Sequence, residues 1–209
     1  MKKILSAIGY SLAIISPESL LRIVKSSLSY IKSGYYKKGF RYIGKCVIIS
    51  KPNIIQGKQR IIVGEKTSIL EGVVLTAICS WRSFRYSPII KIGRNVKIGR
   101  NCHITSINKI TIKDNVLIGA YVTITDHAHG DSIINITPPA ERNLVSKGEV
   151  RIGENVWIGD KVTILPNVII GDGVIIGANS VVSKSLPSYT VCAGNPARII
   201  KQMNKNGNR

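Results

Sequence analysis

The sequence has few acidic residues and few aromatic residues, and each shortage narrows the class of protein. Asp and Glu number 11 against 30 Lys and Arg, so the formal net charge is +19 at pH 7. A charge of this size concerns partners rather than fold, and it points to nucleic acid, an anionic membrane surface or a phosphate-bearing ligand. Aromatic residues make up 6 % of a chain that is 44 % hydrophobic. A core with so few rings suits a narrow solenoid lined by Ile and Val better than a globular core.

The sequence also lacks paired cysteines and a long apolar run. The four cysteines lie far apart and form no CxxC pair: Cys46, Cys79, Cys102 and Cys192. This spacing predicts neither a zinc knuckle nor a disulfide framework, and reduced thiols fit a cytoplasmic protein. The apolar run from Ile4 to Ile15 ends before Pro17 and Glu18, well short of the roughly 20 residues needed to span a bilayer.

A six-residue period runs through the last third of the chain. A branched aliphatic residue returns every six positions at Ile152, Ile158, Ile164, Ile170, Ile176 and Val182. The residue after it is usually Gly, as at Gly153, Gly159, Gly171 and Gly177, which suits a tight or left-handed backbone at a corner. A period of six fits neither a helix nor a lone alternating strand, and it is typical of a stacked β-helix.

The period defines the expected domain organisation. It is degenerate near Val63, clear from Ile92 to Ile124 with one two-residue slip, and absent over residues 125–151 before it resumes. We therefore expect a β-helix over residues 46–192 with an excursion loop at 125–151. Asn195 and Pro196 look like a helix start, so residues 193–209 are expected to form a short C-terminal helix and tail.

Residues 1–45 lack the period and are predicted to be helical. Ser16 and Pro17 suit a helix start, and apolar residues follow at helical spacing, at Leu20, Val24, Leu28 and Ile31. This segment holds nine Lys or Arg against one acid, Glu18. Such a basic amphipathic helix either lies on anionic lipid or caps the open end of the solenoid with a solvated basic face.

Two irregular stretches are candidates for function. The excursion opens with residues 125–130, Thr-Asp-His-Ala-His-Gly, which hold two of the three histidines in the chain. A break of this length in a compact solenoid is usually functional. Residues 81–86, Trp-Arg-Ser-Phe-Arg-Tyr, form an aromatic and basic patch between coils. This patch either stacks on a sugar ring or is a packed loop.

Several motifs together resemble the hexapeptide-repeat acyltransferases. These are Asn155-Val156-Trp157-Ile158-Gly159, the hexads up to Lys184, and Ala193-Gly194-Asn195-Pro196-Ala197-Arg198. The Asp126–Gly130 loop opening and Ser146-Lys147-Gly148 look most like sugar O-acetyltransferases of lipopolysaccharide and capsule assembly. The resemblance covers about residues 90–201. It implies an all-β fold, a left-handed parallel β-helix with three hexads per triangular coil, and a homotrimer with active sites between subunits.

The resemblance also implies a catalytic group. Transfer of acetyl from acetyl-CoA to a sugar hydroxyl needs a base, and histidine suits this task. The matching histidine is His127, which would deprotonate the acceptor hydroxyl for direct attack without a covalent enzyme intermediate. Asp126 or a backbone carbonyl would fix its tautomer. His129 would assist, bind acceptor, or itself be the base.

Residue-by-residue matching gives the expected binding groups. The positions that match cofactor contacts are Trp157, Asp160, Ala178, Ser183, Lys184, Arg198 and Lys201. The three cations among them are the expected phosphate partners, whereas Asp160 departs from the small hydroxyl residue of galactoside relatives. On the acceptor side we expect Asn101, Arg142 and Trp81.

Three alternatives remain open. His127 and His129 with His103 would be a metal set like that of γ-class carbonic anhydrases, although no metal is expected because the 195–198 ending resembles the transferases. The charge also allows a structural or nucleic-acid-binding solenoid, but the cations are not interleaved with a nucleic-acid motif. The nearer alternative is N-acetylation of a nucleotide-linked amino sugar. We expect a cytoplasmic enzyme, at the inner face of the membrane if its acceptor is lipid-linked.

Overall fold

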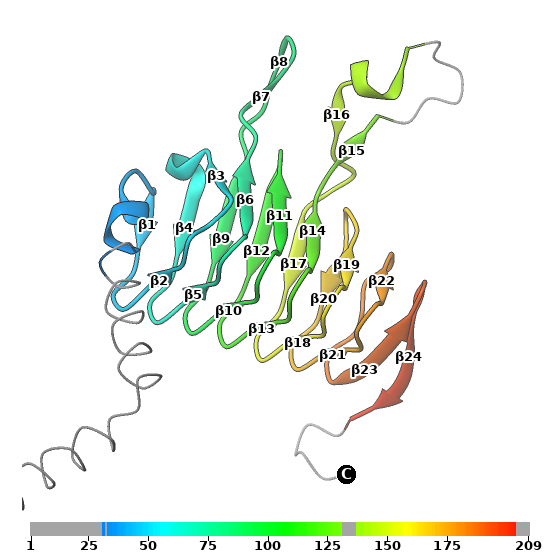
Figure 1. Ribbon diagram of the computed structural model, residues 1–209. Coiled ribbons are helices and arrows are strands. Elements are labelled where there is room, and N and C mark those ends of the chain that lie inside the picture. The colour runs from blue at the N-terminus through cyan, green and yellow to red at the C-terminus, as the bar shows by residue number, and fades with distance from the viewer. Residues whose placement is uncertain (1–30, 32, 131–136, 204–209) are drawn as a thin grey trace, which may run out of the picture.

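The computed structural model describes residues 31, 33–130 and 137–203, and these form a prism of three parallel sheets with two arms at one edge (Figure 1). Strands of the three sheets alternate along the chain, so each turn of the chain adds one strand to every face. The predicted left-handed parallel β-helix is thus confirmed. Within the described residues, no helix has the length and apolarity to cross a membrane.

The faces are here called sheets A, B and C. Sheet A is β1 (Tyr42–Ile43), β4 (Ile61–Val63), β9 (Ile89–Ile92), β12 (Lys109–Ile112), β17 (Val150–Ile152) and β20 (Ile169–Ile170). Sheet B is β2 (Ile48–Ile49), β5 (Ser68–Ile69), β10 (Lys97–Ile98), β13 (Leu117–Ile118), β18 (Trp157–Ile158), β21 (Ile175–Ile176), β23 (Thr190–Gly194) and β24 (Ala197–Gln202). Sheet C is β3 (Ile54–Gln56), β6 (Val74–Ala77), β11 (His103–Ser106), β14 (Thr123–Thr125), β19 (Thr163–Ile164) and β22 (Val181–Val182). A short 3-10 helix, η1 (Lys58–Arg60), follows β3.

The core is a stack of branched aliphatic side chains, one rung per coil. Along the inside of sheet B, Ile98, Ile118, Ile158 and Ile176 lie above one another, each at most 1 % exposed. Burying each such side chain stabilises the fold by about 1.5–3 kcal/mol. Trp157 pairs with Ile175, three hexads later, as the period predicts. The stacked hexads therefore supply the core with few aromatic residues.

The corners differ from the expectation for glycine. The left-handed residues at the corners stand at the fourth position of the hexad, where Asn is the most frequent residue, for example Asn155 and Asn179 with φ of 55° and 59°. The glycines at the second position have ordinary φ, so the left-handed interpretation is wrong for them. They are needed for close approach, because a Cβ built on Gly159 would lie 2.7 Å from the backbone nitrogen of Ala178 in the next coil.

The N-terminal end of the prism is covered by the last turns of a helix. Helical residues run to Lys37, and the buried Ser33 hydroxyl accepts a hydrogen bond from the Ile49 amide at 2.9 Å. Tyr36 and Phe40 pack on the core. The described end of the segment is thus a cap, while the predicted start at Ser16 lies outside the described residues. Strand β1 begins at Tyr42, so the β-helix starts before the predicted boundary at 46.

The predicted C-terminal helix is wrong. Residues 190–194 form β23, which pairs in parallel with β21, and β24 folds back antiparallel on β23. The last coil leaves an open sheet edge with unpaired backbone groups, and a strand satisfies them where a helix would not. Residues 197–202 therefore extend sheet B.

Candidate active site

Two insertions leave the prism at the corner between sheets C and A and form two arms. The first is the hairpin β7 (Ser80–Trp81) and β8 (Phe84–Arg85). The second is the excursion, in which β15 (Ala128–His129) pairs antiparallel with β16 (Leu144–Val145) and is followed by η2 (Pro139–Glu141) before β16. Between them lies a coil with no insertion, whose corner is residues 106–108. The predicted excursion loop is thus an arm with its own strand pairing.

The second arm starts with a buried carboxylate. Sheet C ends at Thr125, and the next side chain, Asp126, points into the prism and is fully buried. It accepts hydrogen bonds from the Ser106 hydroxyl at 2.5 Å and from the amides of Ile107 and Asn108 at 3.0 Å each. These donors belong to the corner of the preceding coil. Asp126 therefore ties the start of the second arm to the coil between the arms.

A fourth donor to this carboxylate is the catalytic candidate. Nδ1 of His127 lies 3.0 Å from Oδ1 of Asp126, and the His127 side chain is 9 % exposed. Burial raises the pKa of the Asp126 carboxyl, but the hydrogen bonds from His127, Ser106 and the two amides outweigh it and hold the pKa below its usual value. Asp126 is then an ionised acceptor at neutral pH, so Nδ1 carries the proton and Nε2 is the basic nitrogen.

Thr125 also contacts the imidazole. Its Oγ1 lies 3.3 Å from Nδ1 of His127 and donates to the His127 carbonyl at 3.0 Å. Both Thr125 and Asp126 contact the same ring nitrogen, Nδ1, and together they orient the imidazole. Ser106 and Thr125 were not predicted as site residues. For Ser106 the reason is that nothing in the local pattern marks a hydroxyl twenty residues away as a partner of Asp126.

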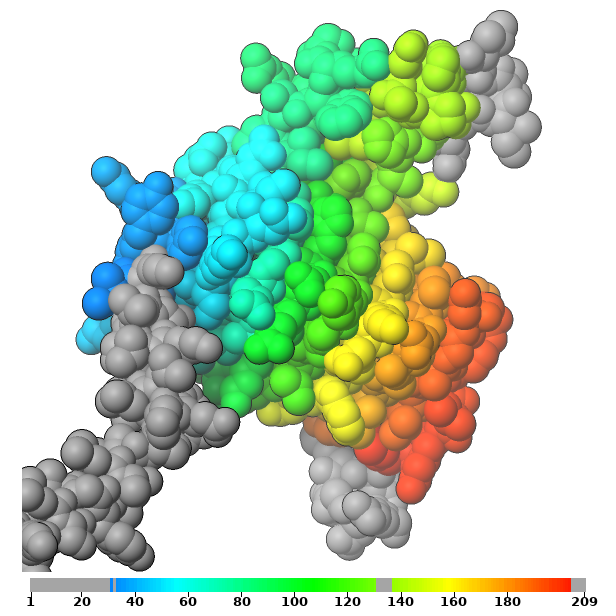
Figure 2. All heavy atoms as spheres, viewed as in Figure 1, coloured from blue at the N-terminus to red at the C-terminus, as the bar shows by residue number. Residues whose placement is uncertain are grey.

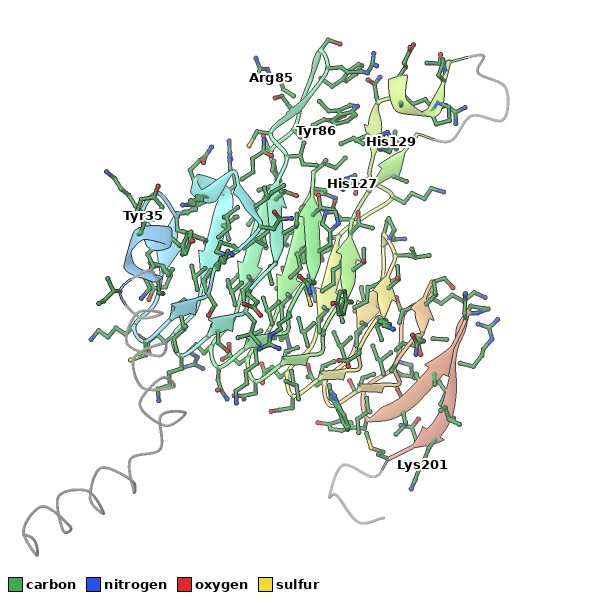
Figure 3. The ribbon with its side chains drawn as sticks, in the orientation of Figure 1. Tyr35, Arg85, Tyr86, His127, His129 and Lys201 are labelled. Carbon is green, nitrogen blue, oxygen red and sulfur yellow. The ribbon has the colours of Figure 1, made fainter. Side chains whose placement is uncertain are left out.

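His129 is held differently. It lies on β15, is exposed, and its ring meets the Trp81 ring edge-on, with centroids 5.4 Å apart. Figure 3 shows His127 at the base of the second arm and His129 farther along it, at about the height of Tyr86 of the first arm. Of the two histidines, His127 is the one that is hydrogen-bonded to Asp126 among the described residues.

The aromatic patch joins the two arms. The Trp81 indole donates to the carbonyl of Arg142 at 3.2 Å, and the Tyr86 hydroxyl donates to that of Leu144 at 3.0 Å. Arg82 reaches the Ala140 carbonyl at 3.4 Å. The arms form one continuous projection in Figure 2. The structure thus brings Trp81, Arg142 and His129 together, and the inner edge of the patch is packed.

A cavity of about 300 Å³ lies under the second arm. It is lined by Ala128, Gly130, Val145, Lys147, Leu165, Pro166 and Ser183, and the surface is hollowed there between the arm and the last coils (Figure 2). The lining is mostly apolar with a cation and a hydroxyl. Of the predicted cofactor positions, Ser183 contributes to this cavity.

The other predicted cofactor positions lie on the last coils. Asp160 and Ala178 occupy the same corner in successive coils, and Asp160 Oδ1 accepts a hydrogen bond from the Ala120 amide at 2.8 Å. That hydrogen bond gives Asp160 a structural task at this corner. Trp157, 52 % exposed, stands on the outer face of sheet B. Lys184, Arg198 and Lys201 are exposed near the end of the prism, the last two on β24.

Among the described residues, neither Asn101 nor His103 makes a side-chain hydrogen bond to Asp126, His127 or His129, although His103 lies near His127. Asn101 is a left-handed corner residue with φ of 54°. His103 stands on the outer face of β11, and partial burial, followed by the nearby His127, lowers its pKa. No group of three His, Cys, Asp or Glu that could hold a metal occurs within residues 33–130 and 137–203.

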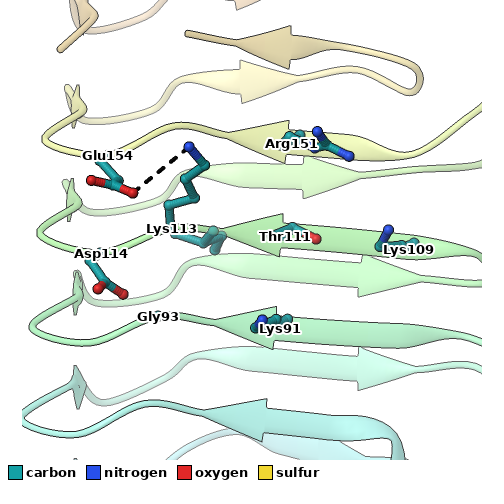
Figure 4. A pocket seen from close by; sticks show the side chains of 9 residues that line it. Lys91, Gly93, Lys109, Thr111, Lys113, Asp114, Arg151 and Glu154 are labelled. Carbon is teal, nitrogen blue, oxygen red and sulfur yellow. Dashed lines mark ion pairs between the residues drawn. The ribbon is translucent and has the colours of Figure 1, made fainter. Parts of the chain in front are cut away.

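A second cavity, of about 350 Å³, lies on the outer face of sheet A (Figure 4). It is lined by Lys91, Gly93, Lys109, Thr111, Ile112, Lys113, Asp114, Arg151 and Glu154. Its cations are largely neutralised, since Lys109 and Arg151 pair with Glu149, and Lys113 pairs with Glu154 and Asp172. This cavity contains none of the predicted site residues.

Comparison with known proteins gives matches over both halves of the prism. The family model "Bacterial transferase hexapeptide (six repeats)" matches residues 149–184, and "Hexapeptide repeat of succinyl-transferase" matches residues 89–126. An Escherichia coli (strain K12) protein that carries the name of a lipopolysaccharide biosynthesis O-acetyl transferase, WbbJ, is 43 % identical over 166 residues, which are 76 % of this chain and 80 % of that relative. The galactoside O-acetyltransferase of the same organism is 40 % identical over 58 % of each chain.

Solved structures show the same fold. A maltose O-acetyltransferase from Clostridium difficile 630 aligns with a TM-score of 0.53 and 31 % identity over 79 % of this chain and 71 % of that one. AntD, an N-acyltransferase from Bacillus cereus in complex with dTDP and 3-hydroxybutyryl-CoA, aligns with a TM-score of 0.67 and 23 % identity over 84 % of this chain and 89 % of that one. With hexad matches in both halves and a relative 43 % identical over most of its length, the chain belongs to the hexapeptide-repeat acyltransferase family and is an acetyltransferase of that family.

Proposed function

We propose that this protein transfers acetyl from acetyl-CoA to a sugar hydroxyl in cell-surface polysaccharide assembly, with His127 as the general base. The observation that carries the proposal is the hydrogen bond from His127 Nδ1 to the buried Asp126 carboxylate, at 3.0 Å. The names of the O-acetyl transferase relatives support the sugar hydroxyl as acceptor.

The arrangement supports direct transfer. Nε2 of His127 would take the proton of the acceptor hydroxyl as its oxygen attacks the thioester carbonyl. The new C–O bond forms, the C–S bond breaks, and the departing thiolate takes the proton back from the imidazolium. Asp126 stabilises the imidazolium during this exchange because its four hydrogen bonds keep it ionised. No covalent enzyme intermediate is needed.

Coenzyme A is proposed to lie along the last coils. The small Ala178 at its corner would let the pantetheine amides approach the backbone, beside Trp157 and Ser183. Lys184, Arg198 and Lys201 would hold the phosphates, since guanidinium and ammonium groups bind phosphate oxygens strongly. The CoA complexes of AntD, which has the same fold, support a ligand of this kind.

The assembly is proposed to be a homotrimer with its active sites between subunits. The outer face of sheet B carries an apolar row, Leu117, Trp157 and Ile175, in which the first two side chains are about half exposed. Such a row suits contact with a second copy or with the cofactor. Cytoplasmic location, and membrane contact through residues 1–45 toward a lipid-linked acceptor, belong to the same proposal.

N-acylation of a nucleotide-linked amino sugar is the second candidate, favoured by the fold shared with AntD. A panel of acetyl acceptors decides between the two. Acetyl-CoA turnover would be measured with neutral sugars, nucleotide-linked sugars and amino sugars, using wild type, His127→Ala and His129→Ala. We expect His127→Ala to lower kcat with a hydroxyl acceptor by about 10²–10⁴-fold, and His129→Ala to lower it less than tenfold. The reverse ranking would make His129 the base, and turnover confined to amino sugars would favour N-acylation.

A further inference from the structure

The first arm is an addition to the coil rather than a part of it. The coil that carries the first arm is longer than the coil after it. Ile62 pairs with Lys91, so that coil contains twenty-nine residues, whereas Lys91 pairs with Thr111, so the next coil contains twenty. The additional residues form the β7–β8 hairpin. A left-handed Arg82, with φ of 54°, begins its turn. This arm is therefore not needed to complete the sheets.

The two arms are positioned at the catalytic candidate. They leave the same corner two coils apart, which is roughly 10 Å at about 4.8 Å per rung. The coil between them supplies the amides that hold Asp126. Trp81 and Tyr86 fix the first arm to the second through two hydrogen bonds and the ring contact with His129. The first arm is thus held beside His127.

The outer end of the first arm is exposed and basic. Arg82, Ser83, Phe84 and Arg85 are all exposed, with Phe84 at 48 %. Residues 79–88 contain two Arg and no acid. Within the described chain, neither guanidinium has an acidic partner in an ion pair, in contrast to Arg94 and Arg100, which pair with Asp114 and Glu71. Figure 3 shows Arg85 near the tip, farther along the arm than Tyr86.

The length of the arm sets the size of the ligand. From the end of β6 to the turn at Arg82 the chain is extended over about five residues, or roughly 16 Å at 3.3 Å per residue. One sugar ring at His127 cannot span that distance. An acceptor that reaches both places must contain several sugars or carry a linked group, and guanidinium groups that have no acidic partner among the described residues select an anion such as phosphate or carboxylate.

We propose that the joined arms bind an extended anionic acceptor, with Arg82 and Arg85 at its charged group, Phe84 against a sugar ring, and the acetylated hydroxyl at His127. This inference rests on the proposed function and specifies its substrate class: oligosaccharides or glycans that carry phosphate or carboxylate, rather than free neutral monosaccharides. Because the arms are joined by Trp81 and Tyr86, the charged end and the reacting end are held in a fixed relation.

The test is calorimetric binding of three trisaccharides: galactotriose, galactotriose 1-phosphate and trigalacturonate. Full-length wild type is compared with Arg82→Gln/Arg85→Gln and with the matched double variant Arg94→Gln/Arg100→Gln, which removes two guanidinium groups from the corners. We expect at least one anionic probe to bind tenfold or more tightly than galactotriose in low salt. The arm variant should lose that tenfold preference, while the corner variant changes it less than twofold, and added salt should weaken it.

Three outcomes overturn the inference. They are equal affinity for neutral and anionic probes, equal loss in both double variants, and a change in oligomeric state by light scattering in the arm variant, which would make the arms a contact between copies. The phosphate and uronate probes distinguish the two anions. His127→Ala should lose turnover but retain its preference for the anionic probe. Binding therefore tests the acceptor arm and turnover tests the proposed chemistry, so failure of one can be told from failure of the other.

Discussion

Asp126 accepts a hydrogen bond from Nδ1 of His127 at 3.0 Å while it also holds the corner of the preceding coil. One buried carboxylate thus orients the candidate base and anchors the start of the second arm. Replacing either partner will affect both chemistry and local structure, and the two effects need separate measurements.

Asp126→Asn should lower kcat by about 10²–10⁴-fold, because the amide no longer fixes the tautomer or stabilises the imidazolium. KM for acetyl-CoA should stay within about threefold, since the residue lies away from the proposed cofactor positions. Steady-state kinetics checks both values. Ser106→Ala is the matched control, because it removes one donor to Asp126 without touching the histidine, and we expect a smaller loss of kcat. Equal losses would show that Asp126 acts through the corner alone.

The stability of the fold should fall in acid partly through Asp126. Its pKa in the folded protein is lowered by hydrogen bonds that outweigh burial, so the ionised carboxylate stabilises the fold above its ordinary pKa of about 3.9. That contribution is lost as pH falls through the lower, folded-state value. Urea unfolding from pH 6 to pH 3 should therefore show a shallower acid limb for Asp126→Asn than for wild type. The partly buried carboxylates Asp114, Glu149 and Asp172 also have lowered pKa values, so some slope should remain.

The proposed phosphate contacts can be tested with two forms of the cofactor. Lys184→Ala and Lys201→Ala should each raise KM for acetyl-CoA by roughly tenfold, which corresponds to one charged hydrogen bond. With 3′-dephospho-acetyl-CoA, the variant that has lost the lysine bound to the 3′-phosphate should have nearly the same KM as wild type. Lys97→Ala, an exposed cation on β10, is the control. If both lysine variants bind the two cofactors as wild type does, these residues are only a solvated basic terminus.

Gly159→Ala should destabilise the prism by about 1–3 kcal/mol, because the new methyl group would lie 2.7 Å from the Ala178 nitrogen of the next coil. Gly34→Ala should instead stabilise the fold. Gly34 is in the described helix with nothing within 4 Å of an added Cβ, and alanine is more favourable than glycine in a helix by about 0.5–1 kcal/mol. Thermal unfolding of both variants checks the pair. A neutral Gly159→Ala would mean that neighbouring coils can separate easily.

Much of the site could be predicted because its residues are adjacent in the chain. Asp126, His127 and His129 stand together where the period breaks, and the motif resemblance marks them. The contacts of Ser106 and Tyr86 could not be predicted in this way, because their partners Asp126 and Leu144 are twenty or more residues away. The predicted acceptor residues Trp81 and Arg142 do meet, while Asn101 serves as a corner residue in left-handed conformation.

The sequence by itself determined the coil. Each hexad places an Ile or Val inward and a small or left-handed residue at the corner, so the same local structure is predicted at every turn. The break in the period at residue 125 is visible in the sequence alone. Only the tertiary structure decided what happens where that repetition stops. Residues 197–202 form a strand because the last coil leaves backbone donors and acceptors unpaired. The sequence of these residues alone does not predict that pairing. The arms met because stacking brings the two insertions to one edge, two rungs apart, and the chain between them sets that spacing.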